Sequence, residues 1–165
     1  MRRKAKLSTI VATALIAATL GVAVTAAQAG GKGITALATG SGQAEVGSGW
    51  RTFSFTALTD GSGQTRGQGQ LNNRDQGVRT HLDIHCLSVV GNRATVSGNI
   101  ADSTNAANVG ASFIFQVLDN GEGAAAPDQI SLVFYAPGNP TFYDHCELYG
   151  PFTNIPVEAG NVQVH

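Results

Sequence analysis

Apolar and polar residues alternate along several short segments of the chain. A period of two places successive side chains on opposite faces of an extended strand, so it predicts half-buried β-strands. The pattern recurs in five segments: WRTFSFTAL (50–58), QTRGQGQLN (64–72), VGASFIFQVLD (109–119), DQISLVFYA (128–136) and GNVQVH (160–165). Glycine-rich turns separate these segments and interrupt the chain too often for long helices.

The clearest hairpin is predicted for residues 78–100. Gly91 and Asn92 lie between two runs rich in β-branched residues, and both residue types tolerate the positive φ of a tight hairpin turn. The same region also has apolar residues near helical spacing, at Val78, Leu82, Cys86 and Val89. The glycine turn and the neighbouring strands favour β structure over this helical alternative.

These patterns predict an all-β fold, either an antiparallel β-sandwich or a small β-barrel, with about seven or eight strands. The alternation does not separate the two architectures. We expect a single β domain over residues 50–165, preceded by a flexible Gly/Ser-rich segment over residues 30–49. All five prolines lie between Pro127 and Pro156, which favours an ordered loop over a strand for residues 136–156.

Residues 1–29 are typical of a secretory signal peptide. Four of the first six residues are basic, an apolar run covers residues 7–24, and AQA at 27–29 fits an A-x-A cleavage site. The apolar run could also form a membrane helix, but the processing site directly after it favours cleavage. We expect a secreted, extracellular product cut after about Ala29, with no membrane span.

The net charge argues against two classes of partner. The whole chain carries a formal charge of −1, and loss of the signal peptide removes four of its ten Lys and Arg, leaving six against eleven Asp and Glu. Such an acidic surface repels phosphate backbones and anionic lipids. We therefore expect neither a nucleic-acid nor a membrane partner.

Cys86 and Cys146 are the two cysteines of the chain. An even pair in an exported protein predicts a disulfide, which would stabilise the fold by about 4 kcal/mol in the chain-entropy model. The alternative, a reactive thiol, usually has a partner such as the second cysteine of a C-x-x-C motif, and none is present.

The stretch HLDIHC (81–86) carries the strongest hint of metal chemistry. In a strand, His81, Asp83 and His85 share the outer face, whereas Leu82, Ile84 and Cys86 share the core face. The two histidines are then roughly 13 Å apart, too far to bind one ion together. In a helix they would have the spacing of an H-E-x-x-H zinc site, but Leu82 stands where that motif has glutamate. A polar outer strand face is the favoured interpretation.

The disulfide could still create a metal site by bringing DHCE (144–147) beside DIHC (83–86). The candidate ligands are then Asp83, His85, Asp144 and His145. Imidazole and carboxylate groups suit zinc and similar ions when three or four converge. No organic cofactor is predicted, and a metal ion is the one cofactor that these residues allow.

Two loops offer other candidate sites. Hard oxygen ligands for calcium occur in DNGEGAAAPD, at Asp119, Asn120, Glu122 and Asp128, although the spacing departs from that of an EF-hand and also suits a plain turn. Aromatic residues in the proline-rich loop could form a platform for a sugar or small ligand, or could cap the core; they are Phe142, Tyr143, Tyr149 and Phe152.

Three segments, GQGQLNNRDQGVRTHLDIHCLSVVGNRATVSGNI (67–100), FQVLDNGEGAAAPDQISLVF (115–134) and VEAGNVQVH (157–165), resemble a group of uncharacterised secreted bacterial domains, some labelled post-COAP-like. The resemblance covers roughly residues 50–165 and implies a secreted all-β domain without an established activity. The group has a pattern similar to IDC where this chain has Ile84-His85-Cys86. A metal role shared by the whole group is therefore in doubt.

The sequence contains no G-x-S-x-G elbow, P-loop or G-x-G-x-x-G motif, so it does not identify an enzyme. We expect a non-catalytic extracellular binding or structural module, with a carbohydrate or other cell-surface component as its ligand. The alternative is a metal-binding protein or metal-dependent secreted enzyme that uses the four candidate ligands named above.

Overall fold

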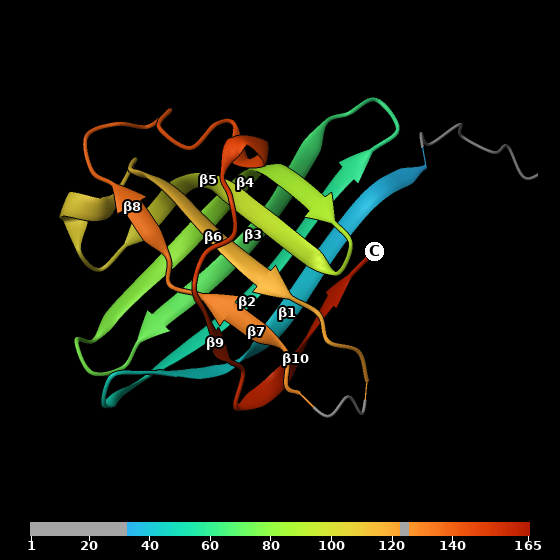
Figure 1. The fold of residues 1–165 in the computed structure, drawn as a ribbon. Coiled ribbons are helices and arrows are strands. Elements are labelled where there is room, and N and C mark those ends of the chain that lie inside the picture. The colour runs from blue at the N-terminus through green and yellow to red at the C-terminus, as the bar shows by residue number, and fades with distance from the viewer. Residues whose placement is uncertain (1–32, 123–125) are drawn as a thin grey trace, which may run out of the picture. The chain divides into compact units, whose positions relative to one another are not determined.

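The computed structural model describes residues 33–122 and 126–165 (Figure 1). These residues form ten β-strands: β1 (Ile34–Val46), β2 (Gly49–Asp60), β3 (Thr65–Asn73), β4 (Val78–Val90), β5 (Arg93–Ser103), β6 (Ser112–Leu118), β7 (Gln129–Ser131), β8 (Phe134–Ala136), β9 (Asn154–Pro156) and β10 (Ala159–Val164). Two short 3₁₀ helices, η1 (Ala106–Asn108) and η2 (Cys146–Leu148), lie in loops. No helix within this part of the chain is long and apolar enough to cross a bilayer. The predicted signal peptide lies outside the described residues.

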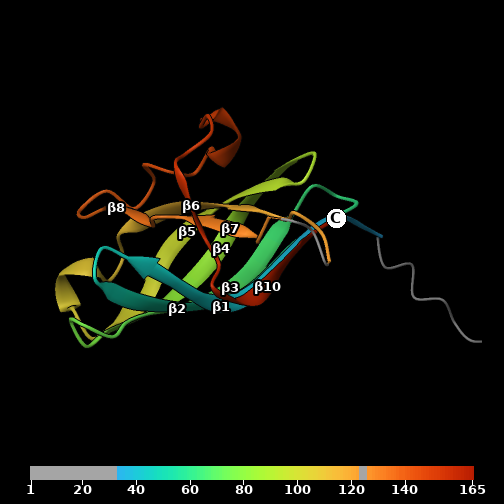
Figure 2. The same cartoon turned by 60° about the horizontal axis from the view of Figure 1, so that its bottom comes forward.

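The strands form one antiparallel sheet in the order β10-β1-β2-β3-β4-β5-β6-β7-β9, with β8 pairing β6 beyond β7. The sheet curls into a half-barrel, so that β6 and β7 lie over the inner face of the first strands (Figures 1 and 2). Phe55 on β2 therefore meets Phe115 on β6 across the interior, with ring centroids 5.2 Å apart. The predicted all-β antiparallel class is confirmed. The structure has ten strands where about seven or eight were expected, because the segment 128–136 divides into β7 and β8, and because β1 and β9 lie in segments that were not expected to be strands.

The core lies inside the curl and follows the predicted alternation. On β2, Phe53, Phe55 and Ala57 are buried, whereas Ser54 and Thr56 are exposed. The same inner face includes residues of β4, β5 and β6, namely Leu82, Ile84, Ala94, Val96, Ile100, Phe113, Phe115 and Val117. Each large apolar side chain buried in this way contributes roughly 1.5–3 kcal/mol.

The expectation that residues 30–49 form a flexible segment is wrong for most of that range, because residues 34–46 form β1 within the sheet. The small residues of this strand allow close packing. A Cβ at Gly40 would lie 2.8 Å from Cε1 of Phe55, and one at Gly42 would lie 2.8 Å from Cγ1 of Val157. Glycine here makes room for neighbouring side chains, and the β domain begins before residue 50.

A β-bulge in β4 changes the face on which Cys86 lies. Ile84 pairs with Gly98, but Cys86 pairs with Ser97, so His85 is an extra residue in the strand. Cys86 therefore lies on the outer side, and the expectation that it shares the core face with Ile84 is wrong. The predicted turn of this hairpin is present, with Gly91 at φ 60°.

A long loop, residues 137–153, covers the outer face of β5 and β6. Polar side chains of the two strands hold its backbone: Asn99 Nδ2 donates to the carbonyl of Pro140 at 2.6 Å, and Gln116 Nε2 donates to that of Gly150 at 2.9 Å. The amide oxygen of Gln116 accepts from the N–H of Phe152 at 2.8 Å. The segment predicted as a loop over residues 136–156 is ordered, and β8 and β9 form its two ends.

Candidate functional site

One end of the half-barrel contains a cavity of about 280 Å³ between the large strands and β7–β9. Its wall consists of apolar side chains from six strands: Ala44, Val46, Phe53, Leu71, Val78, Ile130 and Ile155, together with Leu132 and Val133 between β7 and β8. β7 and β8 both pair with β6 but leave residues 132 and 133 outside the ladder, and these two residues line the cavity. Ligand sites favour such ends of curled sheets.

Polar groups occur at the mouth of this cavity. Arg51, Thr80 and Tyr135 line it together with several asparagines. The guanidinium of Arg51 donates to Oδ2 of Asp75 at 2.8 Å, which holds the long side chain beside the opening. Burial raises the pKa of Tyr135, while the charge of Arg51 and a hydrogen bond with Thr80 act in the opposite direction. The phenol therefore stays protonated at neutral pH and can both donate and accept a hydrogen bond.

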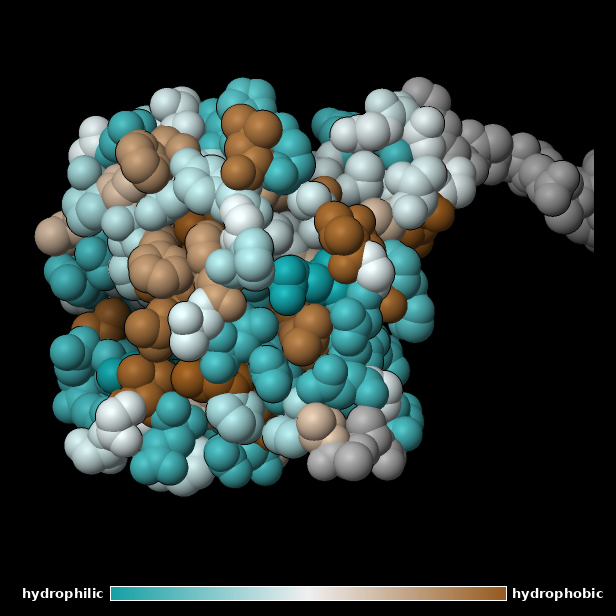
Figure 3. All heavy atoms as spheres, viewed as in Figure 1, coloured by the Kyte–Doolittle hydropathy of each residue, from teal (hydrophilic) through white to brown (hydrophobic). Residues whose placement is uncertain are grey.

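The apolar wall continues onto the surface beside the opening. Leu132 is 46% exposed, Phe134 43% and Tyr135 36%. Figure 3 shows apolar side chains gathered over β7 and β8 on this face. A ligand with an apolar body could therefore extend beyond the cavity without leaving apolar surroundings.

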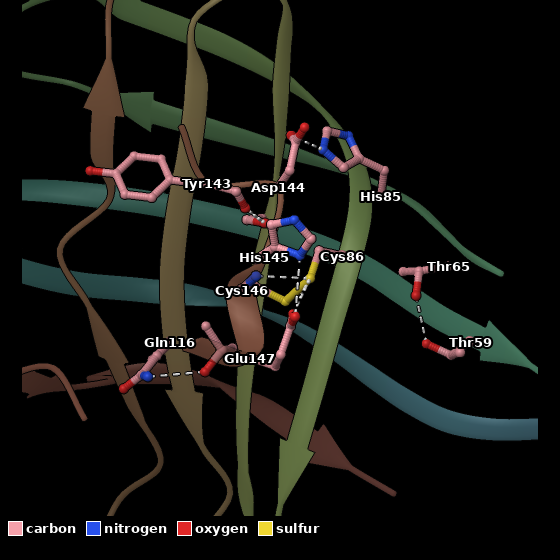
Figure 4. Close-up of a disulfide and its surroundings, with 12 residues drawn as sticks. Thr59, Thr65, His85, Cys86, Gln116, Tyr143, Asp144, His145, Cys146 and Glu147 are labelled. Carbon is pink, nitrogen blue, oxygen red and sulfur yellow. Dashed lines mark hydrogen bonds and ion pairs between the residues drawn. A yellow bond between two sulfur atoms is a disulfide. The ribbon is translucent and has the colours of Figure 1, made fainter. Parts of the chain in front are cut away.

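The predicted disulfide is present and joins β4 to η2. The Sγ atoms of Cys86 and Cys146 are bonded, and the N–H of Cys146 also donates to Sγ of Cys86 at 3.1 Å (Figure 4). Cys146 is fully buried between the loop and the sheet. The bond pins the 137–153 loop to the outer face of the half-barrel.

The four candidate metal ligands are divided between separate contacts. Nε2 of His85 lies 3.1 Å from Oδ1 of Asp144, whereas Nδ1 of His145 lies 3.3 Å from Oε1 of Glu147 (Figure 4). Asp83 lies on the same outer face of β4. In residues 33–122 and 126–165, the one group of three ligand atoms within 4.8 Å of one another is Cys86, Cys146 and Glu147. The two sulfurs of that group are already bonded to each other, so metal binding by the predicted set stays a prediction.

The four aromatic loop residues are divided between a group of three rings and a separate pair. Tyr143 packs edge-on against Phe142 and Tyr149, with ring centroids 4.8 Å and 5.3 Å away. Burial raises the pKa of Tyr143, and the nearby Tyr149 acts in the same direction. Phe152 instead packs against Phe134 of β8 at 5.2 Å. The rings therefore do not make one continuous platform, and only Phe142 among the four is exposed.

The predicted calcium ligands, Asp119, Asn120, Glu122 and Asp128, lie where the two edges of the sheet approach. Oδ2 of Asp128 accepts from the N–H of Val162 at 2.7 Å, and Oδ2 of Asp119 accepts from that of Val164 at 2.9 Å. Each carboxylate also accepts a backbone N–H from its own loop at 2.8 Å. All four oxygens thus have backbone partners. Calcium binding here also stays a prediction.

Sequence reasoning did not find the cavity. Its wall combines strand ends that lie far apart in the chain, such as Val78 at the start of β4 and Ile155 in β9. The available signal was the run Leu132-Val133-Phe134, three consecutive apolar residues within a segment whose alternation predicts one strand.

No protein-family model, curated protein or solved structure matches the chain. The resemblance to the post-COAP-like domains therefore stays an expectation.

Proposed function

We propose that this protein is a non-catalytic extracellular binding module that takes a small amphipathic molecule into the cavity at the end of its half-barrel. The cavity is the observation that carries the proposal. Its volume of about 280 Å³ is roughly twice the ~150 Å³ that holds benzene in an apolar protein cavity. A ring with a short side chain fits that space.

The polar groups at the mouth support an oxygen-bearing head group. Arg51 offers a positive charge and Tyr135 a neutral phenol, so a carboxylate or hydroxyl of the ligand would find donors there. Asp75 partly compensates the charge of Arg51, so we expect head groups with and without charge to be accepted. The apolar body then provides most of the affinity.

Cinnamate and its neutral analogue cinnamyl alcohol are suitable probes, because each has one ring and a short polar side chain. We expect calorimetry to detect binding with a dissociation constant on the order of 1 mM or tighter, as befits about ten non-hydrogen atoms. Failure of both probes to bind the wild-type protein would overturn the proposed ligand class.

Val78→Trp is the blocking variant, because Val78 lines the cavity at the start of β4. Val90→Trp is its matched control at the other end of the same strand, where the side chain is 75% exposed. We expect the first substitution to abolish binding and the second to leave it unchanged. Ile155→Trp fills the cavity from the opposite wall, so it replaces Val78→Trp if that variant does not fold. Equal binding by wild type and by a folded blocked variant would remove the cavity from the proposal.

The extracellular part of the proposal rests on residues 1–29. We expect the N-terminus of the exported protein to begin at about residue 30. N-terminal sequencing of the secreted product measures this directly, and a product that still begins at Met1 would contradict it.

A further inference from the structure

A shallow polar trough crosses the outer face of the sheet on strands β10, β1, β2, β3 and β4. Two rows of paired residues form its sides. One row is Gln163, Thr39, Thr56 and Gln68, and the other is Asn161, Ser41, Ser54, Gln70 and His81. The backbone of Gly40, Phe55 and Gly69 forms the floor between them.

The register of the sheet fixes the shape of this trough. The two rows are two residues apart along each strand, a separation of ~6.7 Å, and five adjacent strands give a length of ~19 Å. The space above the floor is about 670 Å³. The trough is thus several times longer than one sugar ring.

The chemistry of the trough differs from that of its neighbours. The adjoining hollow along one side contains Arg66 and Asp83, and the one along the other side contains Arg79 and Asp102. The side chains that line the central trough are hydroxyls and amides, together with His81 at its end and Phe55 in its floor. Charged groups therefore lie along both borders of the trough, and the first row itself continues from Gln68 to Asp83 on β4.

The polar side chains of the trough are also free to bind. Asn161 donates to Glu122 at 2.9 Å. The other eight side chains make no hydrogen bond to residues 33–122 or 126–165. By contrast, nearby hydroxyls outside the trough are paired, as Thr59 is with Thr65 at 2.8 Å. Hydroxyl and amide groups each supply donors and acceptors.

These features select one class of occupant. The centre of a protein interface and the contact with a lipid are usually apolar, but the one large apolar residue of the trough, Phe55, is 5% exposed. A charged polymer would need opposite charges. Sugar hydroxyls both donate and accept hydrogen bonds, as the groups of the trough do. We propose that this trough binds a neutral polysaccharide chain, laid across strands β10 to β4.

The one phenylalanine ring of the trough, that of Phe55, is only 5% exposed, which predicts weak binding that depends on chain length. Hydrogen bonds alone exchange protein–water contacts for protein–sugar contacts and give little net free energy each. A long chain offers many overlapping registers and so raises the effective affinity. We expect retention by insoluble polymer and little affinity for single sugars.

The test is retention of the full protein by amorphous cellulose, chitin and insoluble starch. Gln68→Leu/Gln70→Leu removes four potential donors and two carbonyl acceptors from the trough while preserving side-chain length. We expect this double variant to lose at least about fivefold in retention, equivalent to ~1 kcal/mol. Gln64→Leu is the matched control, since Gln64 is an exposed residue of the β2–β3 turn outside the trough, and it should bind as wild type does.

Salt dependence distinguishes the neutral ligand from other occupants. Retention by a neutral polymer should persist in ~1 M NaCl, whereas binding to a charged glycan would be screened. Failure to bind all three polymers, loss of retention in salt, or equal retention by the double variant would overturn the proposal. So would wild-type dimerisation that the double variant abolishes, since the trough would then be a contact between copies.

This site is independent of the cavity. Val78→Trp should retain polysaccharide binding, and Gln68→Leu/Gln70→Leu should retain cinnamate binding. A loss of polysaccharide binding and a loss of cinnamate binding can therefore be distinguished by experiment.

Discussion

The carboxylate of Asp128 accepts a hydrogen bond from the backbone N–H of Val162 at 2.7 Å and so connects the start of β7 to the outer edge of β10. Its other oxygen accepts from Asn120 at 2.8 Å. Asp128 is 9% exposed, so water does not readily replace either bond. The Asp128 carboxylate thus accepts the N–H of Val162 as the carbonyl of a neighbouring strand would in a continuous sheet.

We expect Asp128→Asn to lower the free energy of unfolding by about 1.5–3 kcal/mol, because an NH₂ group would face a backbone donor and the charge of the acceptor would be lost. Denaturant titration measures the change. Asp102→Asn is the control at an exposed position of β5 and should stay within about 0.5 kcal/mol of wild type. Equal stability of the two variants would show that the Asp128 bonds contribute little.

Removal of the disulfide should destabilise the fold. Cys86 and Cys146 are separated by 60 residues, so Cys86→Ala/Cys146→Ala should lose about 4 kcal/mol by the chain-entropy estimate. Denaturant midpoints of the oxidised protein and the double variant test this. Mass analysis after alkylation should find no free thiol in the native protein. Coincident midpoints would mean that the hydrogen bonds of the 137–153 loop suffice without the bond.

Tyr135 should make stability fall at alkaline pH. Its folded-state pKa is raised above the ordinary value of 10.0 by burial, so the unfolded chain loses this proton first as the pH rises. Stability is therefore complete below pH ~10 and declines from there through the raised pKa. We expect the free energy of unfolding of Tyr135→Phe to decline less steeply over that window. Parallel curves for the two proteins would contradict the burial of the phenol.

The metal alternative makes a direct prediction. If Asp83, His85, Asp144 and His145 bind one ion, elemental analysis of protein purified without a histidine tag should find stoichiometric zinc, copper or manganese. His85→Ala and His145→Ala should each remove it. The separate His85–Asp144 and His145–Glu147 contacts lead us to expect metal-free protein instead. A stoichiometric ion lost in both variants would reverse that expectation.

Local patterns predicted much of the strand content, because the alternation of Phe53, Phe55 and Ala57 depends only on neighbouring residues. The disulfide followed from the number of cysteines and the signal peptide. The role of β1 could not be predicted in this way. Gly40 is needed because Phe55 and Val162 pack against it, and these two residues lie beside it only because β1 pairs with β2 and β10.

The candidate sites were less predictable for the same reason. The face of the sheet on which Cys86 lies depends on one extra residue in β4. The sequence HLDIHC alone does not predict that bulge. The cavity depends on the break between β7 and β8. The trough uses polar residues of four predicted strands and of β1, which was not predicted, and their alignment into two rows required the register of four strand pairs.

The pairing of β1 with β10 determines when the fold can be completed. During synthesis, β1 emerges long before β10, so its edge stays open while the strands between them form. An open edge is a template for association with other chains. The alanines and glycines of β1 have low β-propensity, so we expect them to slow such wrong pairing until the native partner arrives. The same small side chains that allow close packing in the finished fold would then also limit association of the nascent chain.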